Sequence, residues 1–156
     1  MQPSELLDRE AISIANTAGS KKRVLEEAAA LLAASLPESD PETIYERLLE
    51  RERLGSTGVG HGVALPHARI DGLTRAYGAF VQLGTAVDYD AIDGKPVDLV
   101  FALVVPREAT EEHLQLLAKL AALFSDSALC DRLRVARSEG DIIAEIRTPP
   151  APRHTA

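Results

Sequence analysis

Three histidines and one arginine are the side chains in this sequence whose types and surroundings suit a chemical reaction. His61 and His67 lie in the glycine-rich segment RERLGSTGVGHGVALPHAR, which begins at Arg51, and His113 lies downstream in EEHLQLLAKLAALF. An imidazole can act as a nucleophile, a second imidazole can donate a hydrogen bond, and a guanidinium presents a planar fork to phosphate oxygens. These groups, beside a glycine-rich backbone and a helix start, would suit a phosphoryl group.

The sequence lacks the motifs of a nucleotide-binding loop and of a serine hydrolase, whereas a zinc site stays open. The glycine-rich segment lacks the GxxxxGK[ST] pattern of a nucleotide-binding P-loop, and the chain lacks the G-x-S-x-G elbow of a Ser-His-Asp hydrolase. The three histidines could form a zinc site, although the spacing of His61 and His67 is neither that of HExxH nor that of a zinc finger. A structural or solvated role for each histidine taken alone also stays open. Phosphoryl transfer is the first hypothesis.

Two predicted helices lead to the glycine-rich segment. Ser20 is placed to cap a helix over residues 21–34, in which apolar side chains recur at helical spacing. Asp40 is followed by a proline and a glutamate, which is typical of a helix start. This second helix runs towards Arg53, so it brings Arg51 to the edge of the segment.

Pro66 restricts the backbone just before His67. Its ring fixes its own φ and favours an extended conformation at Leu65. The four glycines upstream allow turns and close approach of other groups. We therefore expect a loop that enters a short extended run over residues 63–65 and ends at His67, whose imidazole is held at the end of a rigid segment.

Three stretches have the composition of strands, and a turn signal lies between two of them. The run VDLVFALVV is almost wholly apolar, as expected of a strand that is covered on both faces. The dipeptide Asp93-Gly94 favours a hairpin between that run and the strand before it. The predicted strands are residues 11–14, 76–83 and 97–105.

Three more helices are predicted after the last strand. The first opens at residues 110–113, which places His113 in its first turn, and the other two are capped by Asp126 and Ser138. Helices thus precede and follow the central strands. This order predicts the α/β class, as a three-layer α/β/α fold with a central mixed sheet flanked by helices.

Composition limits the partners and the setting of the chain. It has 156 residues and a net charge of −7, which argues against nucleic acid as a main partner. With no signal-like N-terminus and no apolar run of ~20 residues for a membrane span, we expect a cytoplasmic protein. Cys130 is expected to be a buried structural thiol. We expect a single domain over residues 1–147 and a disordered proline-rich tail over residues 148–156, which contains His154.

The segments around His67 and His113 resemble enzyme IIA proteins of the phosphotransferase system. The specific part is the GSTG…PH loop combined with the downstream HLQLLAKLA helix, and SKKRVLEEAAALLA matches more weakly. The branch that the chain resembles is the nitrogen-regulatory type, which shares a fold with the mannitol and fructose IIA domains. The resemblance covers nearly the whole chain except its last residues.

The resemblance implies a phosphocarrier that needs no cofactor and no metal. His67 matches the histidine that accepts a phosphoryl group from an HPr-like phosphohistidine donor, His113 matches the second active-site histidine, and Arg51 matches the arginine before the loop. His61 receives no catalytic role. The implied partners are the HPr-like donor and regulated target proteins, such as a transporter or a sensor kinase.

Two alternatives to a regulatory phosphocarrier of nitrogen metabolism or ion transport stay open. One is a sugar-specific IIA of the fructose or mannitol type, which passes the phosphoryl group to a IIB partner. The other is a purely regulatory binding module that passes no phosphate on.

Overall fold

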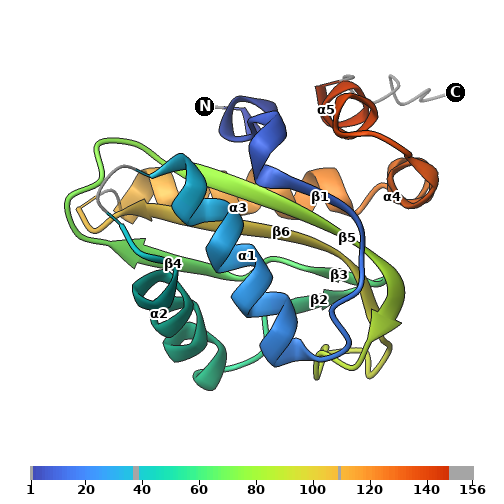
Figure 1. Cartoon of the computed structure of the whole chain (residues 1–156), viewed down its shortest axis with the longest axis horizontal. Coiled ribbons are helices and arrows are strands. Elements are labelled where there is room, and N and C mark those ends of the chain that lie inside the picture. The colour runs from blue at the N-terminus through green and yellow to red at the C-terminus, as the bar shows by residue number, and fades with distance from the viewer. Residues whose placement is uncertain (1, 37–38, 109, 148–156) are drawn as a thin grey trace, which may run out of the picture.

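A mixed sheet lies between two layers of helices in the computed structural model, which describes residues 2–36, 39–108 and 110–147 (Figure 1). This arrangement confirms the three-layer α/β/α fold predicted from the sequence. The strands are β1 (Ile12–Asn16), β2 (Gly58–Gly60), β3 (Val63–Ala64), β4 (His67–Ile70), β5 (Tyr77–Val87) and β6 (Val97–Pro106). The helices are α1 (Lys21–Ser35), α2 (Pro41–Arg53), α3 (Thr110–Phe124), α4 (Ser127–Val135) and α5 (Glu139–Arg147), preceded by the 3₁₀ turns η1 (Pro3–Leu6) and η2 (Arg9–Ala11).

Strand β6 is the centre of the sheet. It pairs with β5 antiparallel, across the predicted turn in which Gly94 takes a φ of 71°. On its other side it pairs in parallel first with β3 and then with β4. Strand β1 lies parallel to β5 at one edge, and β2 lies antiparallel to β3. Because parallel and antiparallel pairs occur together, the predicted mixed sheet is confirmed.

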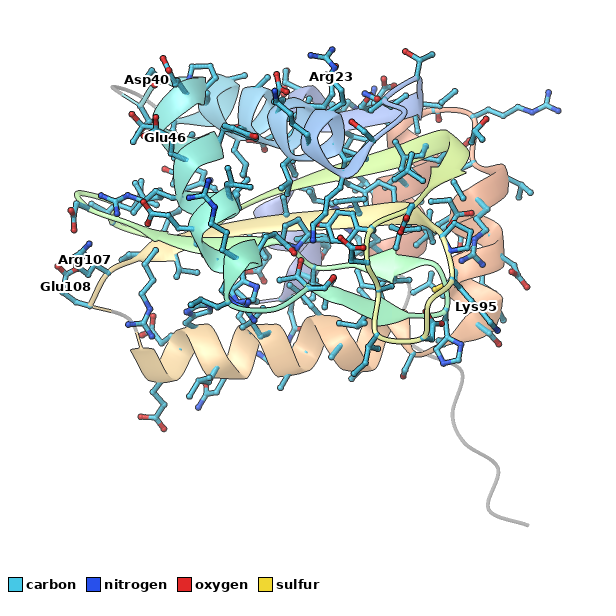
Figure 2. The ribbon with its side chains drawn as sticks, turned by 90° about the horizontal axis from the view of Figure 1, so that it is seen from below. Arg23, Asp40, Glu46, Lys95, Arg107 and Glu108 are labelled. Atoms are coloured by element: carbon cyan, nitrogen blue, oxygen red, sulfur yellow. The ribbon has the colours of Figure 1, made fainter. Side chains whose placement is uncertain are left out.

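Each face of the sheet has its own hydrophobic core. Helices α1 and α2 contribute Val24, Leu32 and Ile44 to the core on one face. Helices α3, α4 and α5 contribute Leu120 and Ile142, among others, to the core on the opposite face. Figure 2 shows α1 on one side of the sheet and α3 along the other. The sheet therefore separates the helix that carries Arg51 from the helix that carries His113.

The helix starts agree with the sequence. The Ser20 hydroxyl accepts a hydrogen bond from the backbone N–H of Arg23, and the Asp40 carboxylate accepts one from Thr43. These contacts satisfy backbone donors that have no partner inside the helix. The Asp126 carboxylate and the Ser138 hydroxyl do the same for α4 and α5. Cys130 is buried, as predicted, and its Sγ donates to the carbonyl of Phe124.

The expectation for the glycine-rich segment was wrong in two respects. Three of its glycines lie in a β-hairpin, in which β2 and β3 are joined by His61 and Gly62, with φ values of 58° and 80°. Two residues with positive φ are what a tight hairpin turn requires. The extended run also does not end at His67, because β4 begins there and follows β6 in the same register as β3, with Val63 opposite Leu99 and His67 opposite Leu103.

Two further observations concern the expectations drawn from composition. The predicted proline-rich tail over residues 148–156, with His154, lies outside the described residues. Within the described ranges, none of the helices has the length and apolar character needed to cross a membrane.

Candidate functional site

The candidate site lies where β4 meets one helix from each face of the sheet. The alternation of side chains along the sequence explains how His67 reaches it. Ala68 and Ile70 belong to the core under α1 and α2, whereas Val63 and Leu65 belong to the core under α3. Since successive side chains of a strand point to opposite faces, His67 points to the face that α3 covers.

Both ring nitrogens of His67 have partners. Nδ1 lies 2.8 Å from the carbonyl oxygen of Leu65, and Nε2 lies 3.2 Å from Nε of Arg51. A carbonyl oxygen accepts and a guanidinium donates, so these partners favour the tautomer with the proton on Nδ1 and the lone pair on Nε2. Nε2 is therefore the ring nitrogen that carries the lone pair.

The surroundings of His67 keep its ring neutral. Burial lowers its pKa from the ordinary value of 6.5, because the charged form loses solvation, and the nearby Arg51 guanidinium also lowers it. The hydrogen bond to Leu65 and the charge of Glu52 act in the opposite direction but do not reverse the shift. A neutral imidazole is the form that can attack phosphorus.

Arg51 is anchored at the end of α2. While its Nε donates to His67, its Nη1 donates to the carbonyl of Gly55 at 2.9 Å. The guanidinium is thus held between the glycine-rich segment and the imidazole. Its guanidinium therefore lies next to Nε2, where a planar fork of donors could bind an anionic group.

His113 lies against His67 on the α3 side. The two ring centroids are 5.2 Å apart and the planes meet at 74°. His113 is only 7% exposed, and neither of its ring nitrogens has a hydrogen-bond partner among the residues that the structure describes. Burial, followed by the charges of His67, Arg69 and Arg51, lowers its pKa to about 4. At neutral pH its ring therefore keeps one N–H donor to offer to a group that arrives beside His67.

The three side chains share a cavity of about 430 Å³. Four arginines line it, although the whole chain has a net charge of −7. Arg47 pairs with Glu50, which also lines the cavity, and Arg107 pairs with Asp71, whereas Arg51 and Arg69 lie closest to the two histidines in sequence or contact. The apolar lining of the cavity includes the exposed Leu54 and Leu114. An anionic group is favoured by the arginines, and a protein surface can pack against the leucines.

The structure thus brings together His67, His113 and Arg51, the three residues that the family resemblance selected. His61 lies at the turn of the β2–β3 hairpin and does not line the cavity. Sequence reasoning missed the Leu65 carbonyl, because a backbone group leaves no residue signature. It also missed Arg69, which a predicted strand through His67 would have placed on the same face two residues further on.

A metal site finds no support at these residues. In the part of the chain that the structure describes, no group of three or more His, Cys, Asp or Glu side chains could hold a metal ion. His61, His67 and His113 therefore do not form the zinc site considered from the sequence.

Comparison with known proteins gives a family and close relatives. Residues 5–148 match the model of a family described as the phosphoenolpyruvate-dependent sugar phosphotransferase system, EIIA 2. A nitrogen regulatory protein from Pseudomonas aeruginosa is 54% identical over 118 residues, which cover 76% of this chain and 77% of that protein. The fructose-specific EIIA component of a phosphotransferase system from Haloferax volcanii is 32% identical over 146 residues, which cover 92% and 95% of the two chains.

Solved structures share the architecture. The crystal structure of nitrogen regulatory protein IIA-Ntr from Neisseria meningitidis has a TM-score of 0.86 and 43% identity, covering 92% of this chain and 97% of that one. The mannitol IIA of Escherichia coli has a TM-score of 0.76 at 22% identity, covering 90% and 98%. The second likeness supports the fold alone.

Proposed function

The chain belongs to the EIIA 2 family of the phosphoenolpyruvate-dependent sugar phosphotransferase system, and on that premise we propose that it is a phosphohistidine carrier of the nitrogen-regulatory type. His67 accepts a phosphoryl group from a phosphohistidine on a small HPr-like protein. The phosphorylated and unphosphorylated forms then act differently on target proteins, such as a transporter or a sensor kinase. We propose that this exchange takes place in the cytoplasm, as expected from the sequence.

The observation that carries this proposal is the pair of hydrogen bonds on His67. The Leu65 carbonyl at Nδ1 and the Arg51 guanidinium at Nε2 favour a neutral ring with its lone pair on Nε2, where Arg51 binds it, and both side chains line the cavity. A histidine that receives a phosphoryl group needs a defined tautomer and donors for the oxygens.

The transfer step follows from the positions of these groups. The Nε2 lone pair of His67 forms a bond to phosphorus while the P–N bond of the donor breaks, and that electron pair returns to the donor's imidazole. Positive charge develops in the ring of His67, whose proton stays on Nδ1, and the Leu65 carbonyl stabilises it. The Arg51 N–H moves from Nε2 to a phosphoryl oxygen, and His113 supplies a further N–H. The step needs positioning and electrostatics rather than other covalent chemistry.

The rim of the cavity supports the docking of another protein. Leu54 is 84% exposed and Leu114 is 63% exposed, and they line the cavity from the residue after α2 and from α3. Exposed leucines beside arginines suit the apolar centre and polar rim of a transient interface. A phosphoryl group on His67 would add a charge of roughly −1.5 to −2 at this rim. The change in charge gives target proteins a means to distinguish the two forms.

The experiment is phosphorylation of the purified chain by phosphoenolpyruvate, enzyme I and an HPr-type carrier. The wild type should gain ~80 Da, the mass of one phosphoryl group, and lose it in acid. His67→Ala should gain nothing. Failure of the wild type to gain mass would reject the phosphocarrier, and normal labelling of His67→Ala would reject the assignment of the site.

A sugar-specific IIA is the second candidate, because the fructose-specific relative is similar over most of both chains. It would pass the phosphoryl group to a IIB protein. Addition of a fructose- or mannitol-type IIB protein to the phosphorylated chain separates the two functions. Rapid loss of the ~80 Da group to IIB supports the sugar-specific carrier, and a stable phosphorylated chain supports the regulatory one.

A further inference from the structure

Glu52 is a buried carboxylate directly after Arg51 in the last turn of α2. Its side chain is 2% exposed. A negative charge is unfavourable both in the interior of a protein and at the C-terminal end of a helix. The contacts of Glu52 must therefore offset a substantial cost.

Four groups surround the Glu52 carboxylate. The backbone N–H of Thr57 donates to it at 3.1 and 3.2 Å, and the Thr57 hydroxyl also donates to Oε1. The Tyr89 hydroxyl donates at 3.0 Å, and burial raises the pKa of this hydroxyl, which keeps its proton. The Lys21 ammonium lies 2.9 Å from Oε2. The carboxylate thus joins α1, α2, the glycine-rich segment and the connection after β5.

A series of hydrogen bonds connects Glu52 to Nδ1 of His67. Thr57 donates three hydrogen bonds to the Glu52 carboxylate. The carbonyl oxygen of Thr57 accepts a hydrogen bond from the backbone N–H of Leu65 at 2.9 Å. The carbonyl of Leu65 in turn accepts from Nδ1 of His67. Each group in this series is a partner of the next.

The hydrogen bond to Nε2 of His67 also comes from the C-terminal end of α2. Arg51 donates to Nε2 of His67 and to the carbonyl of Gly55, which precedes Thr57 in the same tight segment. Arg51 and Glu52 are consecutive residues. Both hydrogen bonds of the His67 ring therefore depend on the end of α2, where Glu52 fixes the backbone.

We propose that Glu52 is a positioning residue for phosphoryl transfer, which fixes the ring of His67 through Thr57 and Leu65 on one side and through Arg51 on the other. The inference rests on the proposed function of His67. A carboxylate that served only to stabilise the packing of α1 against α2 would need the Lys21 ion pair but not this connection to the imidazole.

Glu52→Gln tests the proposal with little change in size. The amide keeps one acceptor oxygen but turns an NH₂ group towards donors, so some of the Thr57, Tyr89 and Lys21 donors lose their acceptor. Two controls accompany it. Glu46→Gln makes the same change on an exposed part of α2, labelled in Figure 2. Ile142→Val removes one methylene from the core on the opposite face and lowers stability by about 1 kcal/mol without touching the network.

Two measurements separate positioning from stability. Single-turnover transfer from the HPr-type donor gives the rate constant at saturation and the donor KM. The ¹⁵N chemical shifts of His67 in the unphosphorylated protein report its tautomer without any transfer. We expect Glu52→Gln to lower the rate constant about 10-fold with the KM within about twofold, and to move the His67 shifts towards a mixture of tautomers. Both controls should match the wild type in both measurements.

The outcomes are distinct. Wild-type rates and unchanged His67 shifts in Glu52→Gln, even with lower stability, would overturn the proposal and leave Glu52 a stabilising residue. Unchanged rates with altered shifts would also overturn it, because the orientation of the ring would then not limit transfer. If Glu52→Gln does not fold, Thr57→Val removes one of the contacts and should give a smaller change of the same kind. Absence of phosphorylation in the wild type would instead reject the proposed function, while the shifts still report whether Glu52 holds the ring.

Discussion

Nε of Arg51 lies 3.2 Å from Nε2 of His67, so the guanidinium covers the atom that is proposed to attack phosphorus. The guanidinium binds the lone pair and lowers the pKa of His67. Under the proposed function, the same donor binds the phosphoryl oxygens after transfer. The resting contact keeps the imidazole neutral and places the guanidinium within reach of the arriving group.

Replacement of this guanidinium should slow transfer strongly. Arg51→Gln removes a charged donor from the developing phosphoryl charge, and we expect the rate constant to fall about 10²-fold. The pKa of His67 should rise, because one of the causes that lower it is removed. Single-turnover kinetics and NMR titration of the His67 ring measure the two effects. Arg53→Gln, an exposed neighbour on α2, is the matched control, and an equal loss of rate in both variants would contradict the role of Arg51.

His113→Phe should slow transfer while still allowing complete labelling. Phenylalanine keeps the ring that packs against His67 but has no N–H to donate. We expect the rate constant to fall about 10²-fold, with the full gain of one phosphoryl group after long incubation. Quenched-flow mass measurements follow the reaction. His61→Asn, at the hairpin turn, should behave as the wild type, and wild-type kinetics in His113→Phe would remove His113 from the mechanism.

The same variant should change how stability depends on pH. The pKa of His113 is lowered from 6.5 to about 4 in the folded protein, chiefly by burial. Between these values the unfolded chain binds a proton that the folded chain does not, so the free energy of unfolding falls as the pH drops from 6.5 towards 4. The loss from this residue should be about 3 kcal/mol. The free energy of unfolding is measured with urea at pH 7 and at pH 4. Between these pH values His113→Phe should lose less of it than the wild type, by about this amount. Equal losses in the two proteins would contradict the lowered pKa of His113.

Gly62 should be less tolerant of a side chain than Gly72, although both have positive φ. Their φ values are 80° and 84°, but a Cβ at Gly62 would lie 2.6 Å from Nη2 of Arg134, whereas one at Gly72 meets nothing within 4 Å. We expect Gly72→Ala to cost about 1 kcal/mol from backbone strain. Gly62→Ala should cost about 2 kcal/mol, because the ends of the Arg134 and Asp98 side chains must also shift and their ion pair is weakened. If Gly62→Ala and Gly72→Ala unfolded at the same urea concentration, the contact with Arg134 would not constrain the hairpin.

Local signals in the sequence predicted most of the helices and strands. Ser20, Asp40, Asp126 and Ser138 were recognised as caps because capping depends on residues within one turn. The apolar run of β6 was recognised because its burial on both faces leaves no polar alternation.

The hairpin of β2 and β3 was not predicted, for a physical reason. Gly58 and Gly60 have no side chains whose alternation could indicate a strand. The hairpin depends on residues far away in the sequence. Gly58 packs so closely against Ala91 that a Cβ there would lie 2.8 Å from it, and β3 pairs with β6. Long-range packing, rather than local propensity, decides this segment.

The site was predicted in part. Residue types and the family resemblance selected His67, His113 and Arg51, which the fold brings together. The Leu65 carbonyl and Glu52 could not be selected, because their effect on the His67 ring passes through backbone groups and depends on the fold.

The central claim is that His67 receives the phosphoryl group on Nε2, and identification of the phosphorylated nitrogen tests it most directly. Protein with ¹⁵N-labelled histidine is phosphorylated by phosphoenolpyruvate, enzyme I and an HPr-type carrier, and long-range ¹H–¹⁵N NMR spectra are recorded before and after. The account predicts that Nε2 of His67 takes the shift of a phosphorylated nitrogen while Nδ1 keeps the proton that it donates to Leu65. A phosphoryl group on Nδ1 of His67, on His61 or on His113 would contradict it.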